Sequence, residues 1–177
     1  MCVRRDNRRG VTLIELVVVV AITGSLVLAL SPFVRKARER AYRQACANNL
    51  RSIGAALYKY AEAHNETFPE CSNAREFVSA LADPNGLYAE DLSIFVCPNT
   101  GHKKGPPGDI ARTPINYMYV SGLKADSPPS TPLCADRVKG PVPAKGDNHG
   151  RSGLNVLYVN GDVKWLTAVP HAKWVKD

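Results

Sequence analysis

The histidines, serines and glycines of the chain show none of the spacings that common catalytic sites require. His64, His102, His149 and His171 are scattered, without an HExxH motif or any i, i+4 pair. No serine stands in a GxSxG elbow, and no glycine-rich loop of the phosphate-binding type is present. The sequence therefore predicts a protein that is not an enzyme.

Acidic residues in the C-terminal part offer oxygen ligands for a cation. Asp136, Asp147 and Asp162 lie close to a predicted hairpin, together with Asn148 and His149. Carboxylate oxygens suit calcium, so one hypothesis is a calcium site built from the three aspartates. The alternative, which we favour, is that Asp and Asn bond to the backbone amides of their own turns and that His149 supports the hairpin. No other cofactor is expected.

One acid stands at the edge of an apolar stretch near the N-terminus. The run from Leu16 to Phe33 carries no charge, and its length as a helix, about 27 Å at roughly 1.5 Å per residue, nearly matches a bilayer core. Glu15 borders this run, where a carboxylate is costly and of no use to a chain that is only tethered. In a chain that packs against copies of itself, Glu15 would pair with a neighbour's terminal amine, provided cleavage after Gly10 creates that amine.

The residues around this acid match a known processing signal. The stretch from Gly10 to Glu15 (GVTLIE), which follows two arginines and precedes an apolar helix, resembles the class III signal of type IV pilins and type II secretion pseudopilins. The resemblance implies that prepilin peptidase cuts after Gly10 and methylates the amine of Val11, where the family usually has phenylalanine. It also implies that Glu15 and Pro32 belong to the assembly helix. The alternative is an uncleaved signal anchor; a Sec-type signal peptide is disfavoured because no small-x-small site follows.

A second resemblance lies near the C-terminus. The stretch from His149 to Trp165 (HGRSGLNVLYVNGDVKW) is similar to the signature of the planctomycete-type prepilin-like group, which consists of a histidine, a spacer and an Asp-Gly turn. Two further segments, Phe95–Pro98 and Tyr117–Gly122, also resemble that group. This chain departs from the signature at Asn160, which replaces an aspartate, and in a longer spacer. The resemblance implies a processed, pilin-like protein of the cell envelope.

The net charge of +7 is concentrated around the apolar stretch. Residues 1–10 contribute +3, Glu15 contributes −1 and Arg35–Arg43 contributes +4, so the chain from Gln44 onward carries only +1. No nucleic-acid partner is therefore predicted. Because the two flanks are nearly equally basic, charge alone does not set the orientation in the membrane. The signal places the leader in the cytoplasm, and an inverted topology is the alternative.

Cysteine usage favours an oxidising compartment. Removal of the leader removes Cys2 and leaves an even number of cysteines. Cys46 falls in a helical pattern and is interpreted as a plain buried thiol, so one disulfide is expected among Cys71, Cys97 and Cys134. Because the sequence contains no CxxC motif, a zinc site is not expected.

Hydrophobic periodicity predicts the helices that position these residues. We expect one helix from Val11 to about His64, bent at Pro32. Its second half carries an apolar stripe at helical spacing: Tyr42, Cys46, Leu50, Ile53, Leu57 and Tyr60. A capping box at Asn73–Glu76 opens a short second helix, which the turn residues of Asp83–Gly86 end.

The predicted strands are short and lie in the second half of the chain. A hairpin is predicted with a two-residue turn at Asn160-Gly161. The expected extended segments are Ser93–Cys97, Ile115–Val120 with Tyr117 and Tyr119 on one face, Thr131–Ala135, Leu154–Val159 and Val163–Leu166. The predicted fold class is α+β, pilin-like, with a long N-terminal helix packed on a small antiparallel C-terminal sheet.

Together these features predict four segments: a leader at 1–10, a transmembrane and assembly helix at 11–34, its amphipathic continuation at 35–64 and a loop-rich head at 65–177. The predicted function is that of a structural subunit, processed by prepilin peptidase and assembled with other pilin or pseudopilin subunits into a pilus or pseudopilus. Its predicted location is the bacterial inner membrane, single-pass, with the head in the periplasm. The alternative is a membrane-tethered binding module, for a ligand or calcium, that does not polymerise.

Overall fold

The computed structural model describes residues 11–82, 88–89, 91–100, 109–145 and 147–175. The chain divides into two compact units, residues 1–38 and residues 39–177. The second unit, residues 39–177, is the head of the folded chain. Helix α1 runs from Leu13 to Ala63, which confirms the long helix predicted from the sequence. Pro32 lies inside α1, whereas the predicted stop at Asp83–Gly86 falls outside the described residues. The predicted bend at Pro32 stays a prediction.

The second half of α1 presents the predicted apolar stripe to the core of the head. Cys46, Leu50, Ile53 and Leu57 are fully buried, and the two tyrosines that end the stripe are half-buried. Gly54 lies where the helix approaches the sheet, since an added Cβ atom would stand 3.1 Å from the side chain of Leu157. A small residue at this position allows the helix to lie close against the sheet.

Helix α2 (Ala74–Leu81) begins with the predicted capping box. The Asn73 side chain accepts hydrogen bonds from the backbone N–H groups of Arg75 and Glu76, and Glu76 in turn accepts one from the Ser72 N–H. These bonds satisfy amides that would otherwise lack partners at the start of the helix. The sequence pattern thus gave both the position and the mechanism of this helix start.

The segment that follows is helical where an extended one was predicted. Leu92–Phe95 forms the short 3₁₀ helix η1, and Pro98–Thr100 forms a second, η2. The prediction of a strand at Ser93–Cys97 is therefore wrong. The physical reason is local: Asp91 caps η1 by accepting a hydrogen bond of 2.8 Å from the Ser93 N–H. Asp favours such turns over strand pairing.

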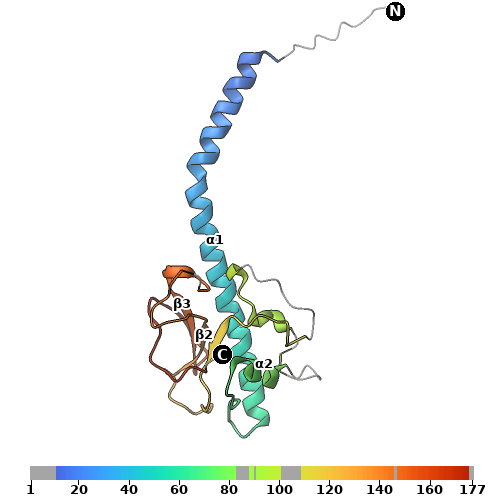
Figure 1. Cartoon of the computed structure of the whole chain (residues 1–177), viewed down its shortest axis with the longest axis vertical. Coiled ribbons are helices and arrows are strands. Elements are labelled where there is room, and N and C mark those ends of the chain that lie inside the picture. Colours follow the sequence, from blue (N-terminus) through green and yellow to red (C-terminus); the bar gives the residue numbers. More distant parts are fainter. Residues whose placement is uncertain (1–10, 83–87, 90, 101–108, 146, 176–177) are drawn as a thin grey trace, which may run out of the picture. The chain divides into compact units, whose positions relative to one another are not determined.

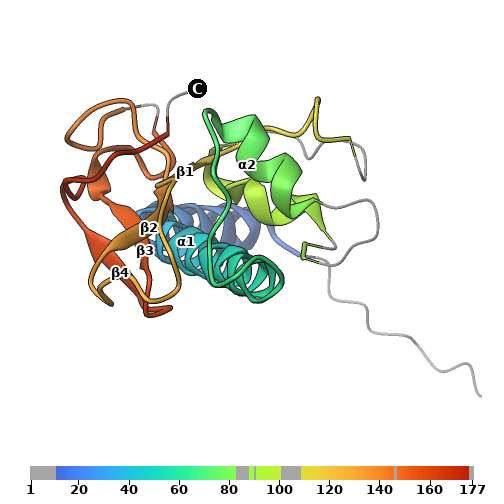
Figure 2. The ribbon, with the colours of Figure 1, turned by 90° about the horizontal axis from the view of Figure 1, so that it is seen from below.

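The head contains a four-stranded antiparallel sheet in the order β1-β2-β3-β4. Its strands confirm the other predicted extended segments and are β1 (Tyr117–Tyr119), β2 (Pro132–Asp136), β3 (Leu154–Tyr158) and β4 (Val163–Leu166). In Figures 1 and 2 these strands lie to one side of the second half of α1, and α2 lies to the other. The predicted α+β, pilin-like fold class is confirmed.

The β3–β4 hairpin is confirmed, but its turn differs from the prediction. Leu157 pairs with Val163, so five residues separate the last paired positions. The Gly161 N–H donates to the Tyr158 carbonyl at 2.9 Å, and Gly161 alone in this loop has positive φ, at 83°. A two-residue type I′ turn requires positive φ at both central residues. The loop is therefore the longer kind, a tight turn followed by a glycine in the left-handed region.

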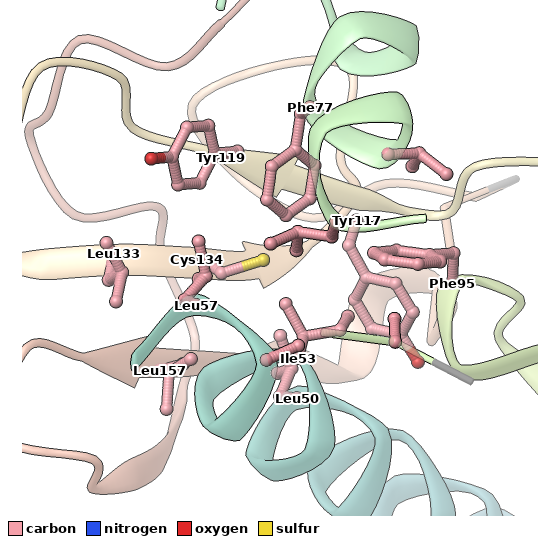
Figure 3. Close-up of a cluster of buried hydrophobic side chains, with 14 of the residues drawn as sticks. Leu50, Ile53, Leu57, Phe77, Phe95, Tyr117, Tyr119, Leu133, Cys134 and Leu157 are labelled. Carbon is pink, nitrogen blue, oxygen red and sulfur yellow. The ribbon is translucent and has the colours of Figure 1, made fainter. Parts of the chain in front are cut away.

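The core of the head joins α1, α2, η1 and the sheet. Figure 3 shows Phe77 of α2 facing the tyrosines of β1, with Leu50, Ile53 and Leu57 of α1 below them. The rings of Phe77 and Tyr119 stack with centroids 4.2 Å apart, and Phe95 meets Phe77 edge-on at 5.8 Å. A smaller cluster of Ala135, Leu154 and Val156 has Met118 and Trp174 packed against it. Alternation along β1 sends Tyr117 and Tyr119 to the main cluster and Met118 to the smaller one.

Candidate functional site

The acid of the N-terminal signal bonds to its own helix start. The Thr12 N–H and hydroxyl donate to Glu15 Oε2 at 2.9 and 2.8 Å, and the Glu15 N–H donates to Thr12 Oγ1 at 3.3 Å. This reciprocal pattern is a capping box at the first turn of α1. The T-x-x-E spacing is typical of a capping box, so the sequence contains evidence for this second role of Glu15 beside the predicted role in assembly. Gly10 lies outside the described residues, and Val11 is exposed.

No residue that the structure describes covers the apolar span that follows Glu15. Every large apolar side chain from Val11 to Val34 is exposed, and α1 is long and apolar enough to cross a membrane. Its hydroxyl groups are satisfied internally, because Thr23, Ser25 and Ser31 donate to carbonyls of the preceding turn. A helix whose polar groups are all bonded within itself suits a hydrocarbon environment.

The three aspartates proposed for calcium have separate local partners. Asp147 accepts hydrogen bonds from the backbone N–H groups of Lys139 and Ala144, and exposed Asp162 bonds to Asn160. These are the turn contacts of the favoured alternative. Asp136, by contrast, is fully buried. Calcium binding by the three together stays a prediction, and no shared arrangement of their oxygens supports it within the described part of the chain.

Asp136 belongs instead to a buried polar cluster in the head, which we define as Cys46, Cys97, Asp136 and His149. Asp136 ends β2, His149 directly precedes the 3₁₀ helix η3 (Gly150–Ser152), Cys97 lies between η1 and η2, and Cys46 lies on α1. The sulfur atoms of the two cysteines and a ring nitrogen of His149 all lie within 4.8 Å of one another. Four segments that are distant in sequence thus bring four reactive side chains together.

His149 stands between two carboxylates. Its Nδ1 is 3.1 Å from Glu39 Oε1, and its Nε2 is 3.4 Å from Asp136 Oδ2. The side chain is fully buried, yet Nε2 makes no hydrogen bond to any of the residues that the structure describes. The ring also meets Trp165 edge-on, with centroids 5.4 Å apart. His149 is therefore held firmly, with one nitrogen bonded and the other directed into the cluster.

Asparagines fix the remaining members of the cluster. Asp136 Oδ2 accepts hydrogen bonds from the Asn155 backbone and side chain, at 2.7 and 2.8 Å. The Cys97 N–H donates to Asn116 Oδ1 at 3.1 Å, and Asn148 donates to the Asn116 carbonyl at 2.6 Å. Such buried networks hold side chains in one arrangement when each member is satisfied. Of the five polar residues that the sequence analysis groups near the hairpin, Asp136 lies beside Asn148 and His149 in the structure.

The ionisation of the cluster follows from these contacts. Burial opposes a charge on His149, but the close approach of Asp136 and Cys97 and the negative charges of these two groups outweigh it and raise the pKa of His149 to about 10. A hydrogen bond with Cys46, helped by His149, lowers the pKa of the Cys97 thiol to about 6. The same bond and burial raise the pKa of Cys46. These shifts favour a negative charge on Cys97 and a positive charge on His149.

The described cysteines are Cys46, Cys71, Cys97 and Cys134, and all are free thiols in the structure. The neighbour of Cys97 is Cys46, which sequence reasoning had assigned to the core alone. A helical stripe gives no hint that one of its members faces a cysteine from another segment. A disulfide among Cys71, Cys97 and Cys134 stays a prediction.

Comparison with known proteins identifies the N-terminal signal. The family model described as the prokaryotic N-terminal methylation motif matches residues 5–31, which contain Gly10, Val11 and Glu15. Neither curated proteins nor solved structures give a match. The chain therefore carries a prepilin-type signal, which implies processing by prepilin peptidase and assembly with pilin-like subunits. The motif and the apolar helix together indicate anchoring in the inner membrane before assembly.

Proposed function

We propose that this chain is a structural subunit of a pilus or of a type II secretion pseudopilus. Prepilin peptidase removes residues 1–10 and methylates Val11, and α1 then packs against the same helix of neighbouring subunits. The head lies on the periplasmic side of the inner membrane before assembly. The planctomycete-type prepilin-like group, suggested by the stretch from His149 to Trp165, is the proposed subgroup.

The observation that carries this proposal is the coincidence of a methylation motif with an uncovered apolar helix. The motif spans residues 5–31, and the large apolar side chains from Val11 to Val34 are exposed. Exposed apolar area of this extent requires lipid or other proteins around it. A membrane accounts for the span alone. A filament accounts for the span and for the acid at its edge.

Glu15 gives the proposal its specific chemistry. In the isolated chain Oε2 accepts both hydrogen bonds from Thr12. A carboxylate has about four lone-pair sites, so this capping leaves room for a further donor. The methylated amine of Val11 on a neighbouring subunit is such a donor, and the resulting ion pair would fix the register between helices in surroundings of low dielectric constant.

The experiment that tests the proposal is an intact-mass measurement on the chain from native-type membranes, with and without a co-expressed prepilin peptidase. With the peptidase, we expect a chain that begins at Val11 and carries one added methyl group. Gly10→Val should block cleavage, whereas the matched variant Gly24→Val, a glycine inside the span with open space around it, should be cleaved normally. An uncut chain in the presence of the active peptidase contradicts the proposal and favours a membrane-tethered binding module.

A further inference from the structure

We propose that Cys46, Cys97 and His149 bind a zinc ion in the core of the head. The three ligand atoms are the two sulfurs and one ring nitrogen, and all three residues are buried. Two thiolates and an imidazole form a donor set typical of zinc and unsuited to calcium, which prefers oxygen. The site goes beyond the proposed function, since it does not depend on whether the chain assembles.

The distances fit a zinc ion after a small adjustment. With zinc–sulfur bonds of about 2.3 Å and zinc–nitrogen bonds of about 2.0–2.1 Å, the ligand atoms of a tetrahedral site are roughly 3.3–3.8 Å apart. The three atoms here lie within 4.8 Å of one another, so side-chain movements of about 1 Å or less bring them to these separations. Rotation about the χ angles of two cysteines supplies such movements without a backbone change.

The histidine is oriented as a zinc ligand. Metal-binding histidines usually donate their second N–H to a carboxylate, which fixes the ring. His149 Nδ1 is 3.1 Å from Glu39 Oε1, whereas the buried Nε2 has no hydrogen bond among the described residues. A buried nitrogen without a hydrogen bond is costly, and a metal ion at Nε2 removes that cost. Glu39, on the same helix as Cys46, is then the orienting carboxylate.

Asp136 stands beside the fourth coordination position. Its Oδ2 is 3.4 Å from His149 Nε2, close to the roughly 3.3 Å expected between a nitrogen and an oxygen that share a tetrahedral zinc ion. Asn155 holds this carboxylate in place through two hydrogen bonds. The protein thus supplies three ligands and a fixed carboxylate next to the open position.

The consequence of such a site is a cross-link between parts of the head that are distant in sequence. It joins α1 to the segment between η1 and η2 and to the residue before η3. Zinc bound to Cys46 and Cys97 would also keep these neighbouring thiols from forming a disulfide in the proposed periplasmic location. Because the ligands come together only in the folded chain, zinc binding adds to the stability of the fold.

The first measurement is the metal content of the full-length chain, purified in detergent without a histidine tag from medium that contains zinc. We expect one zinc per chain after dialysis against metal-free buffer. Cobalt added to the chelator-treated chain should give thiolate-to-cobalt charge-transfer absorption and the strong visible bands of a tetrahedral site. Removal of zinc should lower the unfolding temperature, and zinc added back should restore it.

Variants locate the site. Cys46→Ser and Cys97→Ser should each lose the zinc and the charge-transfer absorption. The matched controls are Cys71→Ser and Cys134→Ala, which remove a half-buried and a fully buried thiol outside the cluster and should keep one zinc. Because the ligand variants could fail to fold, Glu39→Gln is the second test. It should fold, retain zinc and bind it roughly 10- to 100-fold more weakly, as expected for an orienting residue.

Two results would overturn the inference. One is a folded wild-type chain, with all thiols reduced, that takes up neither zinc nor cobalt after reconstitution. If the isolated protein holds a Cys46–Cys97 disulfide, that bond is reduced before the metal is added, and the same result counts against the site. The other is a folded Cys46→Ser, Cys97→Ser double variant that retains the wild-type zinc content. Failure of prepilin processing or of filament assembly has no bearing on either result, so the two proposals fail separately.

Discussion

The two units of this chain place their apolar and polar residues in opposite ways. Within the described part of the chain, every exposed large apolar side chain except that of Val142 lies between Val11 and Val34. The head buries its apolar residues and, in addition, six polar or charged ones: Thr113, Asn116, Asp136, Asn148, His149 and Asn155. The N-terminal unit therefore depends on surroundings outside the chain, whereas the head buries its apolar residues within itself.

Because the two units differ in this way, we expect the N-terminal unit to control membrane insertion and assembly and the head to control the stability of the fold. Substitutions in the N-terminal unit should change insertion or assembly and leave the stability of the head unaltered. Substitutions in the head should do the reverse. The chain offers a clean probe, because its two tryptophans, Trp165 and Trp174, both belong to the head. Tryptophan fluorescence during urea unfolding of the full-length chain in detergent therefore reports the head alone.

The largest expected effect is loss of assembly in Glu15→Ala. Breaking a buried ion pair costs roughly 3–5 kcal/mol, so the yield of filaments should fall by about a hundredfold to a few thousandfold. Membrane insertion and the fluorescence-detected stability of the head should match the wild type. Filament yield by sedimentation and membrane content by fractionation are the measurements.

Two matched variants separate the roles of this acid. Thr12→Ala removes the capping partner but keeps the carboxylate, so assembly should stay near the wild-type level. Glu62→Ala removes an exposed acid from the other end of the same helix and should have no effect on assembly. If Thr12→Ala abolishes assembly as fully as Glu15→Ala does, then Glu15 acts by capping its own helix and not by pairing with a neighbour.

The second expected effect is on the core of the head. Phe77 is fully buried, stacks on Tyr119 and meets Phe95 edge-on. Phe77→Ala should lower the free energy of unfolding by about 3–5 kcal/mol, because it removes the ring and leaves a cavity. Val27→Ala, in the exposed span, should leave that free energy unchanged. Equal losses in the two variants would show that the units are not independent.

The third effect concerns two glycines of the C-terminal segment. Gly153 has φ of 138°, and an added Cβ atom would stand 2.4 Å from the Leu166 carbonyl oxygen. Gly153→Ala should cost about 1–3 kcal/mol from backbone strain, and more from this contact with a neighbouring backbone. Gly161→Ala, with φ of 83° and open space, should cost only about 1–2 kcal/mol. Urea unfolding measures both, and a smaller loss for Gly153→Ala would contradict the packing seen here.

Local patterns predicted much of this fold. The apolar stripe of α1, the capping box of α2 and the β3–β4 hairpin each depend on residues near one another in sequence, and all are present. The wrong prediction of a strand at Ser93–Cys97 also has a local cause. The segment Leu92–Phe95 read as extended because of its apolar residues, but the Asp91 cap turned it into a 3₁₀ helix.

The buried cluster depends on contacts that no local pattern carries. Cys46 looked like an ordinary member of a helical stripe, and His149 looked like support for a hairpin. Only the fold brings them within 4.8 Å, because α1 packs on the sheet next to the segment that holds Cys97. The absence of CxxC argued against zinc only for sites whose ligands are close in sequence, and these ligands are not.

The smallest expected effect concerns the side-chain caps at the starts of α1 and α2, one in each unit. Asn73 caps α2 through two backbone N–H groups, and Thr12 and Glu15 form the equivalent capping box of α1. Asn73→Ala should lower the free energy of unfolding of the head by about 1 kcal/mol, whereas Asn73→Ser, which keeps an accepting oxygen, should have a smaller effect. Thr12→Ala removes a similar cap from the other unit and should leave this free energy unchanged. If Thr12→Ala lowers the free energy of unfolding of the head as much as Asn73→Ala does, the start of α1 is coupled to the head.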